Sequence, residues 1–398
     1  MSVPKGLSKG PVYLDYNATT PVAPAVTEAL LNYVSEEFGN PSSEHHYGSK
    51  PRMALNHARD QVANLLGRSD ARVVFTGSGS EANALAICGV VRATAVERPH
   101  IITQCTEHPA VLETCRALRL RHGVDVTYLP VDGSGMVDPA ELAAAFTPRT
   151  VLVSIMMANN ETGALQPISE LARVTHEHGA LFHSDAAQAV GKLPIDVPAL
   201  GVDLLSVTGH KVYAPKGIGA LYVHPDVSLE PLVRGGGQEY GLRAGTENVA
   251  FAVALGTAAR IVADDLAAGE PERIRGLRDR LHNRLREVLG DRVMLNGPSW
   301  SRLPNTLNIS IDGVRGKDLL TDTPGLAAST GSACHSGQRR PSPVLVAMGL
   351  SIDRGLSALR LSLGRWTTRE DIDRAVEAIS ASALRVSRIG AAGPTPIR

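Results

Sequence analysis

The sequence predicts an α/β fold, with a large domain built on a mostly parallel sheet between two layers of helices and a smaller α+β domain after it. Short apolar runs alternate with helical patterns between about residues 70 and 225, which is typical of a sheet covered on both faces. The chain has 398 residues, enough for one large core and a second, smaller one. Polar side chains also recur directly after the predicted strands, where such sheets carry their functional loops.

The elements of the large domain follow from local patterns. Strands are expected at the short runs 72–75, 100–103, 124–129, 151–155, 181–183, 204–207 and 220–223. Helical patterns separate them at about 81–96, 109–121, 139–146 and 168–178. Right-handed crossovers place the loops that follow parallel strands at one edge of the sheet. The polar residues expected to meet at that edge are His108, Asn160, Asp185 and Lys211.

The remainder of the chain predicts the second domain. Residues 226–250 are rich in glycine and are expected to form an ordered loop, and a helical region follows at about 251–290. Further strands are expected at 306–310 and 359–362, with helices near 343–349 and 369–387. We therefore expect a large domain over residues 18–255 and a small domain made of residues 1–17 and 256–398.

Composition excludes several classes of protein. Lys plus Arg and Asp plus Glu each number 40, so the net charge is zero. Non-specific electrostatic binding to nucleic acid is therefore not expected. No apolar stretch reaches the roughly 18 to 20 residues of a membrane span, and the first residues have no apolar run like a secretory signal. Four irregularly spaced cysteines indicate reduced thiols and a cytoplasmic location. The histidines show no spacing that predicts a metal site.

The most informative pair of residues is Lys211 and Asp185. Lys211 closes a strand in a run of small and hydrogen-bonding residues, where a desolvated amine is a nucleophile for a carbonyl. Asp185 ends the preceding strand and is placed to hold a proton on a pyridine nitrogen. Together these are the two groups that pyridoxal 5'-phosphate requires of its protein. Each alone is weak, since such tripeptides and buried aspartates also occur by chance.

A phosphate site is expected at the turn of residues 76–81, which follows a strand and opens a helix. Gly79 allows close approach of the backbone, Ser80 offers a hydroxyl, and the helix N-terminus favours an anion. Thr208 and His210, beside the lysine, are further donors to the same group. The alternative is a helix cap without a ligand.

Three residues are expected around the cofactor ring. Gln188 and Asn160 can reach its phenolic oxygen, although Asn160 also suits a turn before a glycine. His108 can lie over the ring and transfer protons near neutral pH, the alternative being a structural histidine.

Two further residues carry chemistry in the small domain. Cys334 lies in a run of small residues unlike core packing, so it is expected to be an available thiol nucleophile. Arg360 is a charge inside an apolar strand and suits a substrate carboxylate, the alternative being an internal salt bridge.

At this point the chain resembles the cysteine desulfurases and selenocysteine lyases, which have the class V aminotransferase fold. The matching segments run in family order over nearly the whole chain: 13–21, 39–43, 106–108, 159–163, 183–188, 209–211, 235–239, 243–246, 331–334 and 360–364. One departure is Ala84, where the family's phosphate turn usually has a polar residue.

The resemblance implies the aspartate aminotransferase-like fold of pyridoxal-phosphate-dependent transferases, and a role for each residue. Lys211 would bind the cofactor, His108 would stack on it, and Asp185 and Gln188 would bind its ring. Phosphate contacts would come from Gly79, Ser80, Thr208 and His210. Thr246 would complete the phosphate site of a neighbouring subunit, which implies a homodimer.

For the substrate, the resemblance implies that Asn160 and Arg360 hold the carboxylate side and that Cys334 accepts the sulfur. The expected function is therefore conversion of L-cysteine to L-alanine, with a persulfide left on Cys334 for a sulfur-acceptor protein. Selenocysteine lyase is the alternative, since selenium leaves more easily and depends less on the thiol. A non-catalytic assembly partner and an unrelated transaminase are disfavoured, because the lysine and the loop cysteine are both present. The acceptor stays open among iron–sulfur scaffolds, transfer-RNA thiolation enzymes and dedicated carriers.

Overall fold

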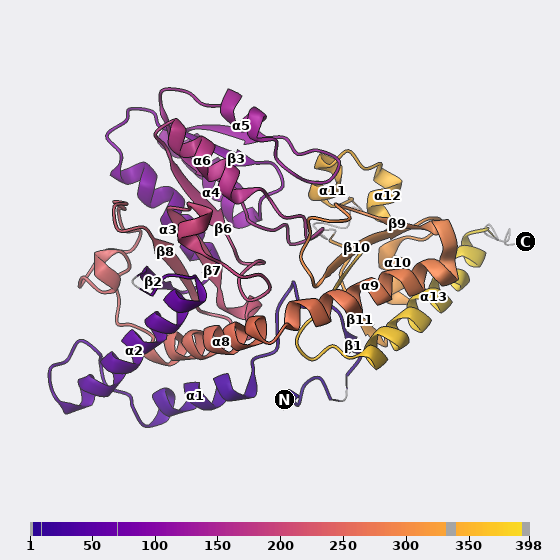
Figure 1. Cartoon of the computed structure of the whole chain (residues 1–398), viewed down its shortest axis with the longest axis horizontal. Helices are drawn as coiled ribbons and strands as arrows, with labels where there is room; N and C mark the ends of the chain where they lie inside the picture. The colour runs from indigo at the N-terminus through magenta and orange to yellow at the C-terminus, as the bar shows by residue number, and fades with distance from the viewer. Residues whose placement is uncertain (1–2, 9, 70, 332–339, 392–398) are drawn as a thin grey trace, which may run out of the picture.

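The computed structural model describes residues 3–8, 10–69, 71–331 and 340–391 (Figure 1). Its largest sheet has seven strands in the order β2-β8-β7-β6-β5-β3-β4. Neighbouring strands are parallel except at β8, which is antiparallel to both β2 and β7. The strands are β2 (Arg72–Thr76), β3 (His100–Gln104), β4 (Asp125–Leu129), β5 (Thr150–Ser154), β6 (Leu181–Asp185), β7 (Leu204–Thr208) and β8 (Gly219–Val223).

Helices cover both faces of this sheet, and successive buried residues of a strand pack into the two apolar cores in turn. In β2, Val73 and Phe75 join one apolar cluster while Val74 joins the other, as the two-residue period of a strand requires. The helices of this part are α1 (Pro24–Ser35), α2 (His46–Leu65), α3 (Gly79–Ala93), α4 (Pro109–His122), α5 (Pro139–Ala144), α6 (Ile168–Glu177), α7 (Val197–Leu200) and α8 (Val249–Ala267). The short 3-10 turn η1 (Gly209–Lys211) follows β7, and η2 (Glu239–Gly241) lies in the glycine-rich loop.

A second body is built on the antiparallel sheet β12-β10-β9, with a parallel pair β1-β11 beside it. Its strands are β1 (Val12–Tyr13), β9 (Val293–Leu295), β10 (Thr306–Ile311), β11 (Leu326–Ala327) and β12 (Ala358–Ser362). Its helices are α9 (Glu270–Leu289), η3 (Gly290–Arg292), α10 (Gly316–Thr321), α11 (Pro343–Ala347), α12 (Ile352–Leu356) and α13 (Arg369–Ala391). The long helices α9 and α13 lie side by side (Figure 1) and share one apolar core.

The two bodies meet where α8 gives way to α9. Gly269 has a φ of +78°, in the left-handed region that favours glycine, and so redirects the chain between the helices. Helix α8 packs on α1 and α2, whereas α9 packs on α13 (Figure 1). Helix α8 continues past residue 255, the predicted end of the large domain. The predicted boundary between the two domains therefore stays a prediction.

The predicted α/β class is confirmed, and the predicted strands of both sheets occur within two residues of the expected bounds. The helical region expected at 251–290 is two helices rather than one. Helices α1 and α2 and the short strands β1, β9 and β11 were not predicted. No helix in the described part of the chain is both long and apolar enough to cross a membrane.

Candidate active site

A cavity of about 320 Å³ lies beside the carboxyl ends of β6 and β7, within the size range of small-molecule sites. It brings together ten of the residues predicted from the sequence: Gly79, Ser80, His108, Asn160, Asp185, Gln188, Thr208, His210, Lys211 and Arg360. Thr246 is exposed and is not among the lining residues. Cys334 lies outside the described residues.

Lys211 ends the turn η1 after β7 and is half-buried. Its Nζ donates to the backbone oxygens of Asn17 and Ala18, each at 2.7 Å. Burial, reinforced by the positive charge of Arg360, lowers the pKa of Lys211 to about 8. About a tenth of this amine is therefore uncharged at pH 7 and able to attack a carbonyl carbon, far more than for an ordinary lysine.

Asp185 is the last residue of β6 and is held by two N–H donors. Its Oδ2 accepts from Asn83 Nδ2 at 2.7 Å, and its Oδ1 accepts from the backbone N of Ala187 at 2.9 Å. Asn83 lies on α3 and also lines the cavity, and its Oδ1 is buried with no hydrogen-bond partner in the described structure. The carboxylate is thus fixed at the cavity wall and suited to a cationic N–H group.

His108 caps the N-terminus of α4, because its Nδ1 accepts from the backbone N of Ala110 at 3.1 Å. Accepting this bond requires a lone pair on Nδ1, so the neutral ring carries its proton on Nε2. His108 is exposed, yet partial desolvation of its ring lowers the pKa of His108; Asp185 opposes this shift and Lys211 reinforces it. The ring is therefore predominantly neutral near pH 7.

The phosphate turn is built for close packing against β7. A Cβ added to Gly79, the first residue of α3, would lie 1.8 Å from Thr208 Oγ1, so this position accepts glycine alone. Ser78 caps the helix by accepting from the backbone N of Glu81, whose carboxylate accepts from Gly77 N at 2.8 Å. The start of a 15-residue helix and the Thr208 hydroxyl therefore meet at one end of the cavity, where an anion is favoured.

Two other polar residues border the cavity. The ring of His210 contacts Thr19 Oγ1 at 3.1 Å, and burial, reinforced by Lys211, lowers the pKa of His210 to about 4. Gln188 is buried, and its Nε2 donates to Asn17 O at 3.0 Å. The neutral imidazole and the amide both offer donors without adding charge.

Arg360 combines the two interpretations that the sequence left open. Its Nη2 forms a salt bridge with Asp15 at 2.8 Å and its Nη1 donates to Asn160 O at 3.1 Å. Its Nε is buried and has no hydrogen-bond partner among the described residues. An internal ion pair therefore holds this guanidinium at the cavity wall, where its remaining N–H groups suit a carboxylate.

This set of side chains fits the pyridoxal phosphate that the sequence predicted. Gly79 and the start of helix α3 suit its phosphate. The Asp185 carboxylate suits its ring nitrogen, and the Lys211 amine suits its aldehyde. The unpaired Asn83 Oδ1 and Arg360 Nε atoms leave the polar network around this cavity incomplete.

Comparison with known proteins agrees with this geometry. The model of the family "Aminotransferase class-V" matches residues 12–375. The chain belongs to this family. A cysteine desulfurase IscS from Dictyoglomus turgidum is 44% identical, covering 93% of this chain and 94% of the relative. A solved "NifS-like protein" is 35% identical with a TM-score of 0.86, covering 93% of this chain and 98% of that one.

A third relative is the solved structure titled "SspA in complex with cysteine". It is 37% identical to this chain, with a TM-score of 0.78, and the match covers 89% of this chain and 99% of that one. The resemblance inferred from the sequence motifs is therefore confirmed at the level of family and fold.

Five residues in or near this cavity were not singled out from the sequence: Asn17 and Asn83 line it, whereas Asp15, Glu107 and Lys192 do not. Glu107 is buried with its Oε2 unpaired among the described residues, and burial holds its pKa well above the ordinary value. A spacing of four residues could have indicated one of them, since Asn83 follows Gly79 by one turn of helix α3. Asp15 carried no local signal, because its partner lies 345 residues away.

Proposed function

We propose that this chain is a pyridoxal 5'-phosphate-dependent cysteine desulfurase, which converts L-cysteine to L-alanine and transfers the sulfur to Cys334. The observation that carries the proposal is the meeting of Lys211, Asp185 and Arg360 in one cavity. An amine with a lowered pKa, a fixed carboxylate and a guanidinium with a free donor are the groups that an amino-acid substrate and this cofactor require.

When bound, the cofactor supplies an electron sink for the substrate's α-carbon. Lys211 would hold the cofactor by its aldehyde, and the freed Nζ is placed to take the substrate's α-proton. Asp185 keeps a proton on the ring nitrogen, and the neutral His108 ring lies at the cavity wall to move protons through Nε2. The Arg360 guanidinium, with Asn160 beside it, would orient the substrate carboxylate.

The sulfur step balances without an added oxidant or reductant. The Cys334 thiolate attacks the substrate sulfur, so that a sulfur–sulfur bond forms while the bond between sulfur and the β-carbon breaks. The β-carbon takes up a proton, the α-carbon regains the proton that Lys211 removed, and the product is alanine, with one persulfide left on the protein. An acceptor protein then removes the outer sulfur. The role of Cys334 rests on its sequence context.

The relatives support this assignment, since the Dictyoglomus turgidum protein is named a cysteine desulfurase and the SspA structure contains cysteine. Thr246 is exposed and lies apart from its own cavity, which suits a residue that completes the site of a second copy in a homodimer. The cytoplasm suits the reaction, because it keeps thiols reduced. The described cysteines, Cys88, Cys105 and Cys115, are free.

The test is to supply cysteine and selenocysteine separately to the purified holoenzyme while alanine is measured and persulfide is trapped for mass spectrometry. We expect alanine from cysteine in equal amount to trapped sulfur, with the persulfide on Cys334. The Cys334→Ser variant should lose sulfur transfer by about 10³-fold or more and keep the bound cofactor's absorption.

A matched control is Cys88→Ala, which removes a thiol of helix α3 outside the cavity and should leave turnover unchanged. Sulfur transfer by Cys334→Ser at the parent rate would contradict the role of this thiol. Turnover of selenocysteine alone would assign a selenocysteine lyase instead.

A further inference from the structure

The orientation of the Gln188 side-chain amide is set from both of its ends. Nε2 donates to Asn17 O at 3.0 Å, and Oε1 accepts from Lys192 Nζ at 2.7 Å. The reversed amide would place an oxygen against the Asn17 carbonyl and an NH2 group against the lysine's donors. Both contacts therefore favour the same orientation.

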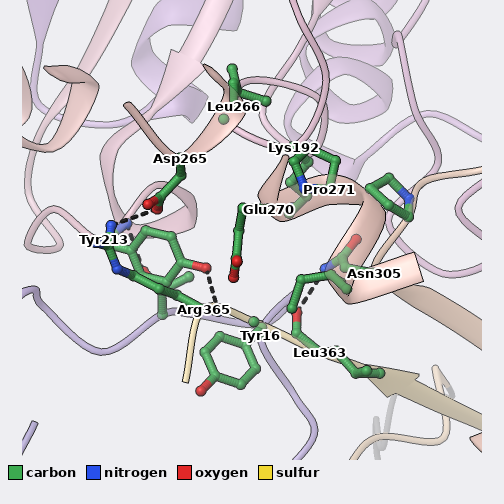
Figure 2. A pocket seen from close by; sticks show the side chains of 15 residues that line it. Tyr16, Lys192, Tyr213, Asp265, Leu266, Glu270, Pro271, Asn305, Leu363 and Arg365 are labelled. Atoms are coloured by element: carbon green, nitrogen blue, oxygen red, sulfur yellow. Dashed lines mark hydrogen bonds and ion pairs between the residues drawn. The ribbon is translucent and has the colours of Figure 1, made fainter. Parts of the chain in front are cut away.

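Lys192 reaches this amide from a second cavity, at the junction of the two bodies (Figure 2). That cavity measures about 30 Å³, room for one or two water molecules and too little for an amino acid. Lys192 therefore does not belong to a second active site. Its Nζ instead contacts Gln188 twice, at the side-chain Oε1 and at the backbone oxygen, the latter at 3.0 Å.

The Nε2 end of the amide lies on the side of the large cavity. Asn17, its partner, lines that cavity together with Gln188, whereas Lys192 lines the small one. Asn17 O also accepts from Lys211 Nζ, so the Gln188 donor lies close to the amine that engages the cofactor. A donor at this position suits an anionic oxygen on the cofactor ring.

We propose that Lys192 is a positioning residue that fixes the Gln188 amide with its N–H donor toward the anionic ring oxygen of the cofactor. The inference rests on the proposed cofactor site and adds a residue that touches neither cofactor nor substrate. Burial, together with the charges of Lys211 and Arg360, holds the pKa of Lys192 well below its usual value. An uncharged amine still donates two hydrogens, which is enough for both contacts to Gln188.

The test uses Lys192→Met, which keeps the length of the side chain and removes its donors. Apoprotein reconstituted with pyridoxal 5'-phosphate should bind it about tenfold more weakly than the parent, because a donor to an anionic oxygen is no longer held in place. The pH midpoint of the holoenzyme's visible absorption should rise by about half a unit or more, since the donor stabilises the anionic oxygen. A purely structural lysine would leave that midpoint where it was.

Two comparisons separate positioning from general damage. Lys317→Met removes an exposed lysine on α10 and should change neither quantity. In a Gln188→Ala background, Lys192→Met should have no further effect on cofactor affinity or on the midpoint, because it acts through the amide. A full effect of Lys192→Met in that background would overturn the proposal, as would parent-like affinity and midpoint for the single variant.

Gln188→Glu tests the same orientation with Lys192 in place, and serves if Lys192→Met does not fold. The glutamate keeps an acceptor for the lysine but sets an oxygen against Asn17 O, so the apoprotein's Tm should fall by a few degrees, and cofactor affinity should fall by about tenfold or more because the N–H is lost. Parent-like affinity in Gln188→Glu would overturn the proposal. A parent chain that binds no cofactor at all would instead contradict the proposed function.

Discussion

The two cavities of this protein differ in how their buried polar groups are satisfied. In the large cavity, Asn83 Oδ1 and Arg360 Nε are buried without partners in the described structure, and Lys211 has a pKa lowered to about 8. In the small cavity (Figure 2), Arg365 pairs with Asp265, and Asn305 donates to the Leu363 oxygen at 3.1 Å. None of the described residues lining the small cavity has a buried side-chain atom left unpaired.

This difference separates a site that awaits a ligand from one that joins two bodies of the fold. Unpaired buried polar atoms are costly, so proteins keep them mainly at functional sites. Paired groups around a cavity with room for water alone serve stability instead. The predictions below test this division, from the largest expected effect on the large cavity to the smallest.

The largest effect is expected from Lys211→Ala, which removes the nucleophilic amine. Turnover of cysteine should fall by about 10³-fold or more, because both the engagement of the cofactor and removal of the α-proton depend on this group. Alanine production and the visible absorption of the reconstituted protein measure the loss. Lys317→Ala, at an exposed site, is the control, and parent-like turnover in Lys211→Ala would assign the chemistry to another group.

The pH dependence of cofactor capture should report the lowered pKa of Lys211. Only the uncharged amine attacks an aldehyde, so the capture rate should rise about tenfold per pH unit below pH 8 and level off above it. Stopped-flow absorbance of apoprotein mixed with cofactor gives this profile. With free Nα-acetyllysine, which keeps its side-chain amine, the capture rate measured in parallel should keep rising to about pH 10. A protein profile that follows the free amino acid would contradict the desolvation of Lys211.

A smaller effect is expected from Gly79→Ala at the phosphate end of the large cavity. The added Cβ would meet Thr208 Oγ1 at 1.8 Å, so the helix start and the hydroxyl must move apart. Cofactor affinity should fall by about tenfold, as measured by titration of the apoprotein. Gly276→Ala in α9, where a Cβ meets nothing within 4 Å, is the matched control and should keep the affinity. Equal cofactor affinity in both variants would show that this turn does not bind the cofactor's phosphate.

The smallest effect on cofactor binding is expected from Asp265→Asn in the small cavity. The change leaves the Arg365 guanidinium largely buried without its carboxylate and should lower the free energy of unfolding by about 2 to 4 kcal/mol. Urea denaturation measures this loss, and cofactor affinity should stay at the parent value. A large fall in affinity with unchanged stability would reverse the roles given to the two cavities.

The fold and most of the large cavity were predictable because their signals are local. The central strands read as apolar runs, and the ends of parallel strands meet at one sheet edge, so Asp185 and Lys211 were expected to be neighbours. Helix α2 gave a weaker signal, since it is mostly polar and contains Pro51. Strands of two residues, such as β1 and β11, are too short to show a period.

The rest of the site depends on contacts between distant segments. The Asp15–Arg360 pair and the contact of Gln188 with Asn17 join residues 345 and 171 positions apart, and no local pattern predicts such partners. Lys192 follows Gln188 by four residues, but no helix or strand of the structure includes this pair. The structure separates the two lysines by their cavities. Lys211 lines the large cavity and Lys192 lines the small one, so Lys211 is the one assigned to the cofactor.

That choice between lysines is the most direct test of the account. Holoenzyme would be treated with borohydride, digested and examined by peptide mass spectrometry for the mass of the reduced cofactor. We predict that the added mass lies on the peptide containing Lys211 and that the peptide containing Lys192 is unmodified. Label on Lys192, or no label on a protein that carries the cofactor's colour, would contradict the assignment of the large cavity as the active site.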